Sequence, residues 1–158
     1  MNRIGMGFDS HRFVKGRPLK LCGVSIDHEL GLAGHSDGDA ALHALIDAML
    51  GASGMGDIGE HFPDTQKEWK NADSSLLVYE AMEIVLQSGW VPINCDVTII
   101  TEAPGLKMRR HEMRERIADL LGLDSTAVSV KAKTAEGMGL IGGGEGLAAF
   151  AVVLMEEL

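Results

Sequence analysis

The sequence predicts an α/β (α+β) fold, a two-layer sandwich in which helices pack on one face of a mixed four-stranded sheet. Three observations lead to this prediction. Segments in which apolar residues alternate, as in strands, are interspersed with longer segments of helical period. Many of these segments are separated by glycine, which occurs 20 times. The chain of 158 residues is long enough to bury one core, so we expect a single domain over 1–158.

The N-terminal part is predicted to contain two strands and a helix. Apolar residues alternate with smaller ones up to a D-S-H motif at 9–11, and residues 19–26 show a second strand-like pattern. A helix is predicted over 37–50, because Ser36 is a suitable N-cap and Gly51 a suitable end.

The remainder of the chain is predicted to contain two more helices and three more strands. Each helical segment carries its apolar residues on one side, and each strand segment alternates. The expected elements are a helix over 72–88, a strand over 93–101, a helix over 106–121, a strand beginning at 128 and a strand over 147–155.

Two glycine-rich segments lie between these elements. Residues 54–65 are a long loop of the kind that often carries binding residues. The run Gly142-Gly143-Gly144 is interpreted as a bend in a strand rather than a phosphate loop, because neither a helix N-terminus nor G-K-[ST] follows it.

The composition limits which kinds of binding partner and which cellular compartment are expected for this protein. The net charge is −9, from 14 basic and 23 acidic residues, and no basic stripe is visible, so we expect no nucleic-acid partner. No apolar run could span a bilayer and no leader pattern begins the chain, so we expect no membrane partner and a cytoplasmic location. Cys22 and Cys95 form no C-x-x-C motif; a disulfide between them stays possible, but buried thiols are favoured.

Three side chains form a ligand set that zinc favours. Asp9 and His11 alternate in an extended segment and therefore share one face, while His43 comes from the predicted helix. Three protein ligands leave a position open for water or substrate, which indicates catalysis rather than a structural role. Asp39 and Asp47 lie on the same helix face as His43; they either support the ligands or are solvated.

Five motifs in order along the chain resemble the 2-C-methyl-D-erythritol 2,4-cyclodiphosphate synthase family, over nearly its whole length. They are G-F-D-S-H from Gly7, H-S-D-G-D-x-x-x-H-A from His35, G-D-I-G-x-x-F-P-D from Gly56, D-V-T-I-I from Asp96, and K-A-x-T-x-E-G-x-G from Lys131, followed by G-x-G-E-G.

The resemblance implies one reaction. The 2-phosphate of 4-diphosphocytidyl-2-C-methyl-D-erythritol 2-phosphate attacks the β-phosphorus, CMP leaves, and 2-C-methyl-D-erythritol 2,4-cyclodiphosphate forms in non-mevalonate isoprenoid biosynthesis. Such an enzyme is a metal-dependent phosphorus–oxygen lyase. Zinc, or another divalent transition metal, would be bound by Asp9, His11 and His43, and Mg²⁺ or Mn²⁺ on the diphosphate by Glu136.

The resemblance also implies roles for the remaining motif residues. Catalytic positions that hold the phosphates are His35 and Thr134, and substrate contacts extend to Asp9, His11, Ser36, Lys133 and Glu136. The methylerythritol pocket matches Asp57, Gly59, Phe62, Pro63 and Asp64, and the cytidine pocket matches Thr101, Ala103, Pro104, Gly105, Leu106 and Lys107.

In the family the enzyme is a homotrimer with active sites between subunits, so the same assembly is expected here. The chain departs from common family patterns at four positions. Gly105 replaces a lysine, Lys133 replaces a threonine, and Gly143 and Phe150 replace an arginine and a glutamate that face each other along the trimer axis. The paired loss of charge predicts a more apolar central channel.

Two other functions are compatible with the ligand set. A zinc phosphohydrolase would use the open metal position to activate water, but no residue near the set is an obvious base. A non-catalytic, metal-dependent binding protein would bind zinc and show slow or absent turnover.

Overall fold

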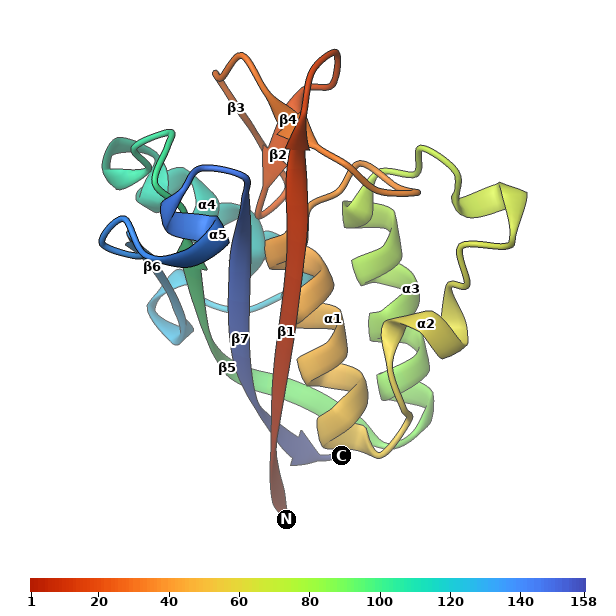
Figure 1. Ribbon diagram of the computed structural model, residues 1–158. Coiled ribbons are helices and arrows are strands. Elements are labelled where there is room, and N and C mark those ends of the chain that lie inside the picture. Colours follow the sequence, from red (N-terminus) through yellow and green to blue (C-terminus); the bar gives the residue numbers. More distant parts are fainter.

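The chain forms seven strands, which the computed structural model of residues 1–158 arranges as one five-stranded sheet and one two-stranded hairpin (Figure 1). The strands are β1 (Asn2–Val14), β2 (Leu19–Leu21), β3 (Val24–Ile26), β4 (Gly31–Leu32), β5 (Trp90–Ile100), β6 (Val128–Lys133) and β7 (Gly146–Glu157). The sheet order is β4-β1-β7-β5-β6, antiparallel throughout except for the parallel pair β5 and β6.

The helices form the second layer of the sandwich. They are α1 (Ala40–Ser53), α2 (Ile58–His61), α3 (Ser74–Gln87), α4 (Arg110–Leu121) and α5 (Gly139–Gly142), with 3₁₀ turns at Lys67–Trp69, Lys107–Arg109 and Ser125–Ala127. Helix α1 lies against the sheet, whereas the opposite face of β1 and β7 is left uncovered by helices (Figure 1). The predicted two-layer α/β architecture is confirmed.

Two strand predictions are wrong in detail. The sheet has five strands instead of four, because Gly31 and Leu32 pair with the end of β1 and add a short edge strand. The single strand predicted over 19–26 is a hairpin, because Cys22 (φ 55°) and Gly23 (φ 73°) have left-handed backbone conformations that reverse the chain.

Helix α1 begins and ends three residues later than predicted. Its N-cap is Asp39 rather than Ser36, and the Asp39 carboxylate accepts hydrogen bonds from the backbone N–H groups of Leu42 (3.1 Å), Cys22 (3.0 Å) and Gly23 (2.7 Å). The helix ends at Gly54 (φ 73°), which adopts the left-handed C-cap conformation that glycine favours and donates its backbone N–H to the last carbonyl groups of the helix. The Asp39 carboxylate therefore links the start of α1 to the β2–β3 turn. Burial and the charge of the neighbouring Asp37 raise the pKa of Asp39 to about 6.

The glycine-rich run before β7 is not a bend in a strand. Residues Gly139–Gly142 form the short helix α5, and Gly143 follows as its C-cap. Helix α4 also begins later than predicted, because Lys107–Arg109 form a 3₁₀ turn first. The other predicted elements, α3, β5, β6 and β7, are confirmed to within three residues at each end.

The core lies between the sheet and the helices and is built around α1. Every residue of α1 except Asp47 and Gly51 is buried. A helix that is apolar all round is typical of one buried in the interior. Besides the sheet, α1 packs against α3, which lies beside it in the helical layer (Figure 1).

Both cysteines are free and buried in this core, as expected. Burial, with a contribution from Asp96, raises the pKa of the Cys95 thiol to about 12, and burial raises the pKa of the Cys22 thiol well above its usual range. Because the thiolate is the reactive form, we expect the native protein to resist a thiol reagent such as DTNB at neutral pH. In urea, both thiols should react; rapid labelling of the native protein, or no free thiol in urea, would contradict this.

No helix of the chain is both long enough and apolar enough to cross a membrane.

Candidate functional site

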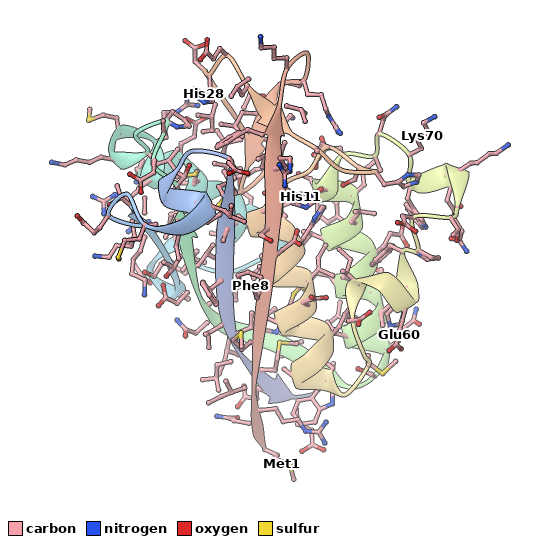
Figure 2. The ribbon with its side chains drawn as sticks, viewed as in Figure 1. Met1, Phe8, His11, His28, Glu60 and Lys70 are labelled. Atoms are coloured by element: carbon pink, nitrogen blue, oxygen red, sulfur yellow. The ribbon has the colours of Figure 1, made fainter.

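The inner face of β1 carries the first two candidate metal ligands. Strand alternation points Gly5, Gly7, Asp9 and His11 toward the helices, while the intervening residues face outward. His11 lies farther along β1 than Phe8 in Figure 2. Helix α1 brings His43 to the same place, so the structure assembles the three residues that the sequence grouped.

The ligand atoms of the three side chains converge. Asp9 Oδ2 lies 2.7 Å from His11 Nε2 and 3.0 Å from His43 Nδ1, and the two histidine nitrogens are 3.2 Å apart. One ligand atom from each residue lies within 4.8 Å of the others. Two nitrogens and one carboxylate oxygen in this arrangement can hold a divalent metal ion such as zinc.

The remaining ring nitrogens point away from the cluster and have their own partners. His11 Nδ1 lies 2.5 Å from the carbonyl oxygen of Ala33, so that nitrogen carries the proton and donates it. His43 Nε2 lies 2.9 Å from the Ser74 hydroxyl and 3.1 Å from that of Ser36. Metal-binding histidines typically donate their second N–H in this way, so the cluster fits a metal centre.

The cluster is electrostatically matched to a cation. Burial opposes ionisation of Asp9, but hydrogen bonds from His11 and His43 hold its pKa well below the ordinary range. Burial likewise opposes protonation of His11, but its hydrogen bond to Asp9 raises the pKa of the ring. Asp9 is therefore a carboxylate at neutral pH and available as a ligand.

Asp39 and Asp47 are not part of the ligand cluster. Asp39 caps α1, as described above. The carboxylate of Asp47 accepts a hydrogen bond from the backbone N–H of Ile58 (2.7 Å), and burial raises its pKa. Asp47 therefore fixes the start of α2 against α1 instead of contacting a metal.

A cavity of about 470 Å³ opens beside the cluster. Its walls come from β1, α1, the loop before α1, and the 58–77 region, and most residues predicted for the phosphates and methylerythritol line it. Its lining includes His11, His35, Ser36, His43, Gly59, Phe62, Pro63 and Asp64.

Asp57 does not line this cavity, because its carboxylate caps α2 by accepting the N–H of Glu60 (3.0 Å). Three apolar side chains of the cavity were given no role from the sequence, namely Ile58, Trp69 and Leu77. Ile58 stands in the G-D-I-G motif, whereas residue type alone does not distinguish Trp69 and Leu77 from core residues.

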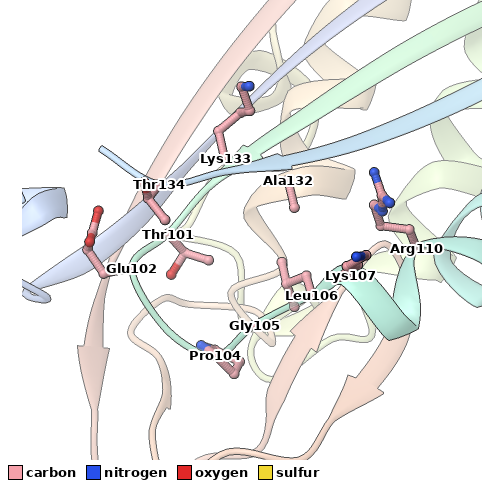
Figure 3. A pocket seen from close by; sticks show the side chains of 10 residues that line it. All are labelled: Thr101, Glu102, Pro104, Gly105, Leu106, Lys107, Arg110, Ala132, Lys133 and Thr134. Carbon is pink, nitrogen blue, oxygen red and sulfur yellow. The ribbon is translucent and has the colours of Figure 1, made fainter. Parts of the chain in front are cut away.

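A second pocket, of about 280 Å³, lies between the loop after β5 and the end of β6 (Figure 3). The predicted cytidine residues Thr101, Pro104, Gly105, Leu106 and Lys107 line it, together with Lys133 and Thr134. Ala103 is not in its lining, but its carbonyl accepts a hydrogen bond from Thr101 Oγ1 (2.6 Å) and shapes the loop.

Two charged residues of this second pocket were given no role from the sequence: Glu102, within the segment 101–107 matched to the cytidine pocket, and Arg110, outside it. Arg110 stands in the first turn of α4, and Glu102 accepts a hydrogen bond from the backbone N–H of Ala135 (2.6 Å). Figure 3 shows Lys107 and Arg110 at one end of the pocket and Glu102 at the other. Glu136 is exposed just outside, and its carboxylate accepts a hydrogen bond from the Thr134 hydroxyl (3.3 Å).

Within one chain the two halves of the site are separate. No residue lines both cavities. The metal cluster and its cavity lie beside α1 and α3, whereas the second pocket lies beside α4 and β6, on the other side of β1 and β7 in Figure 1.

The model of the YgbB family matches residues 2–156, nearly the whole chain. This chain belongs to the YgbB family. Among curated relatives of the family, 2-C-methyl-D-erythritol 2,4-cyclodiphosphate synthase of Salinibacter ruber is 51% identical over 155 residues, covering 98% of this chain and 99% of that protein.

Other YgbB relatives are longer. The bifunctional enzyme IspD/IspF of Hyphomonas neptunium is 54% identical over 153 residues, which are 97% of this chain but only 40% of that protein. This chain thus spans about two fifths of the length of such bifunctional relatives. A solved 2C-methyl-D-erythritol-2,4-cyclodiphosphate synthase with CDP bound superposes with a TM-score of 0.90 at 40% identity, covering 98% of this chain and 100% of that one.

Proposed function

We propose that this protein is a 2-C-methyl-D-erythritol 2,4-cyclodiphosphate synthase that acts in non-mevalonate isoprenoid biosynthesis in the cytoplasm. Its substrate would be 4-diphosphocytidyl-2-C-methyl-D-erythritol 2-phosphate and its second product CMP. The observation that carries the proposal is the convergence of Asp9, His11 and His43 beside a cavity lined by the matching phosphate-binding residues.

The reaction is an intramolecular phosphoryl transfer. A 2-phosphate oxygen forms a new bond to the β-phosphorus, and the bond from the β-phosphorus to the oxygen bridging it to the α-phosphorus breaks. The electron pair leaves with CMP, and no general base is needed because the attacking phosphate is already anionic. Catalysis then depends on positioning and on charge neutralisation.

The residues of the metal half suit this requirement. Zinc at Asp9, His11 and His43 would supply positive charge that polarises a phosphate oxygen. His35 and Ser36 line the same cavity and would hold the phosphates by hydrogen bonds. The carboxylate of Asp64 and the backbone around Gly59 would bind the hydroxyl groups of methylerythritol.

The second pocket suits the cytidine diphosphate. Lys107, Arg110 and Lys133 place three positive charges around it, in a chain whose net charge is −9. The Thr134 hydroxyl would contact the phosphates, and Glu136 would bind Mg²⁺ or Mn²⁺ on the diphosphate. Family members commonly have a lysine at the position of Gly105. The positive charges of Lys107 and Arg110 would replace the charge of that lysine in the pocket.

The separation of the two pockets and the uncovered face of the sheet support a homotrimer with shared active sites. The uncovered face carries Phe8 and Phe150, whose ring centroids are 4.9 Å apart, with Met6 and Val152 beside them. Met6 is 62% exposed in the single chain. A contiguous apolar surface of this kind is typical of a subunit interface, and the Phe8–Phe150 pair agrees with an apolar centre of the assembly.

Replacing Met6 with aspartate is expected to dissociate the trimer, because three carboxylates would be buried near one axis. Sedimentation velocity would show a monomer, and turnover would fall together with assembly if the site is shared. Leu76→Asp is the matched control, since Leu76 is 58% exposed on α3 away from this face. An intact trimer in Met6→Asp would contradict the proposed interface.

Phosphorus NMR of the purified protein with substrate, zinc and magnesium tests the activity. CMP and two coupled diphosphate resonances would establish the cyclase. Release of inorganic phosphate would instead favour the zinc phosphohydrolase. Unchanged substrate with a zinc-loaded protein would favour a binding protein.

A further inference from the structure

Two residues outside the ligand cluster converge on His43 from a different part of the chain. Ser74 begins α3 and is fully buried, and Asp37 lies in the loop before α1. The Ser74 hydroxyl donates to Asp37 Oδ1, and the same hydroxyl oxygen lies 2.9 Å from His43 Nε2. Asp37, Ser74 and His43 therefore form a continuous chain of hydrogen bonds ending at a metal-ligand candidate.

The direction of each hydrogen bond in this chain follows from counting protons. A serine hydroxyl has one proton, and the carboxylate of Asp37 can only accept. Since the Ser74 proton is donated to Asp37, the Ser74 oxygen can only accept from His43. His43 therefore carries a proton on Nε2, so a neutral His43 ring presents the lone pair of Nδ1 to Asp9 and His11. A second proton on Nδ1, donated to Asp9 Oδ2 at 3.0 Å, belongs to the imidazolium form and has to leave before a metal ion binds.

From this geometry we infer that Asp37 and Ser74 are positioning residues that fix the tautomer and the orientation of His43 for metal binding. The inference rests on the proposed metal-dependent function. Without Asp37, the Ser74 hydroxyl could rotate and donate to His43, which would allow the tautomer protonated on Nδ1. That tautomer has no lone pair at the cluster and cannot bind a metal ion there.

Asp37 is not simply the cap of α3. That role belongs to Asp73, whose carboxylate accepts the backbone N–H of Ser75 at 2.8 Å. Asp37 makes further bonds that hold its carboxylate in place, accepting the backbone N–H groups of Ser74 (3.0 Å) and Asp39 (3.0 Å). Its carboxylate thus joins the starts of α1 and α3 at the point where His43 lies.

The first measurement is zinc affinity, by competition with a chromophoric chelator and with zinc as the only ligand. Ser74→Ala and Asp37→Asn should each weaken zinc binding by about 10- to 100-fold, the usual effect of losing such a partner. The amide introduced by Asp37→Asn cannot accept at both carboxylate positions, because one of its two groups is a donor. Ser36 lies 3.1 Å from His43 Nε2, so Ser36→Ala/Ser74→Ala should weaken binding further than Ser74→Ala alone.

Matched controls separate this role from stability. Ser75→Ala removes a neighbouring buried serine, and Asp73→Asn alters the actual cap of α3. Both should retain zinc affinity even where the urea midpoint falls, and Ser74→Thr should restore much of the affinity lost in Ser74→Ala. Equal losses of affinity in Ser75→Ala and Ser74→Ala, or no loss in the Ser36/Ser74 double variant, would overturn the inference.

The second measurement is ¹⁵N NMR of the histidine rings in metal-free protein, at a pH where imidazole is neutral. The unmodified protein should show His43 protonated on Nε2, and Asp37→Asn should show a mixture of tautomers. A wild-type ring protonated on Nδ1 would overturn the inference. Because neither turnover nor metal enters this readout, it remains decisive even if the proposed activity fails.

Discussion

Replacing His43 with alanine should abolish stoichiometric zinc binding and lower turnover roughly 1,000-fold or more, because two remaining ligands cannot hold the metal ion proposed to neutralise the phosphates. His43 is 8% exposed and lies at the meeting point of β1, α1 and α3. Zinc content by atomic absorption and product formation by phosphorus NMR measure the two effects. The proposed trimer should still form, because His43 lies on the inner side of the sheet, away from the apolar outer face.

His111→Ala is the matched control for this substitution. His111 is an exposed histidine on α4 that belongs to neither the metal cluster nor its cavity. Its variant should keep the zinc content and the turnover of the unmodified protein. Full turnover in His43→Ala would refute the metal assignment, whereas a monomeric His43→Ala would show that the residue also supports assembly.

Replacing Gly7 with alanine should reduce the free energy of unfolding by more than about 3 kcal/mol or prevent folding, because the added methyl group collides with backbone rather than with a movable side chain. A Cβ atom at Gly7 would lie 1.9 Å from the carbonyl oxygen of Ala44, and one at Gly5 would lie 1.8 Å from that of Ala48. Two residues along a strand and four residues along a helix advance by similar distances. The Gly5–Ala48 and Gly7–Ala44 contacts therefore follow one another along the line where β1 and α1 touch. The variant is measured by urea unfolding.

This close approach also serves the site, since His43 directly precedes Ala44. Any Gly7→Ala protein that folds must have α1 displaced from β1, so it should bind zinc more weakly as well. Gly51→Ala is the matched control within the same helix, because nothing lies within 4 Å of its added Cβ and its backbone is helical. It should leave stability unchanged or raise it by about 0.5–1 kcal/mol. Gly7→Ala with wild-type stability would show that α1 can shift without loss of packing.

The extent to which the sequence predicts the site differs between its two halves. The pair Asp9 and His11 is fixed by local geometry, because alternation in a strand places them on one face whatever the rest of the fold does. The residues of the second pocket were identified through family motifs, and Arg110 stayed hidden because its position depends on how α4 packs beside β6. Local periodicity carries no information about such packing between distant segments.

The helix boundaries illustrate the same limit. Ser36 and Asp39 are both acceptable N-caps by residue type, and sequence favoured the first. The structure uses Asp39, because its carboxylate also receives two backbone N–H groups from the β2–β3 turn, which is a contact between segments far apart in sequence. Ser36 is then free to turn its hydroxyl toward His43.

The sequence by itself determined the fold class, the three candidate ligands and the family, because each follows from local periodicity, residue chemistry or the order of motifs. Only the tertiary structure decided what surrounds them: that Asp39 and Asp47 anchor neighbouring segments, that Asp37 and Ser74 orient His43, and that the two pockets are separate within one chain. The physical reason is that hydrogen-bond direction and close packing depend on which distant backbone and side-chain groups meet, and that is fixed only when the layers of the sandwich are assembled.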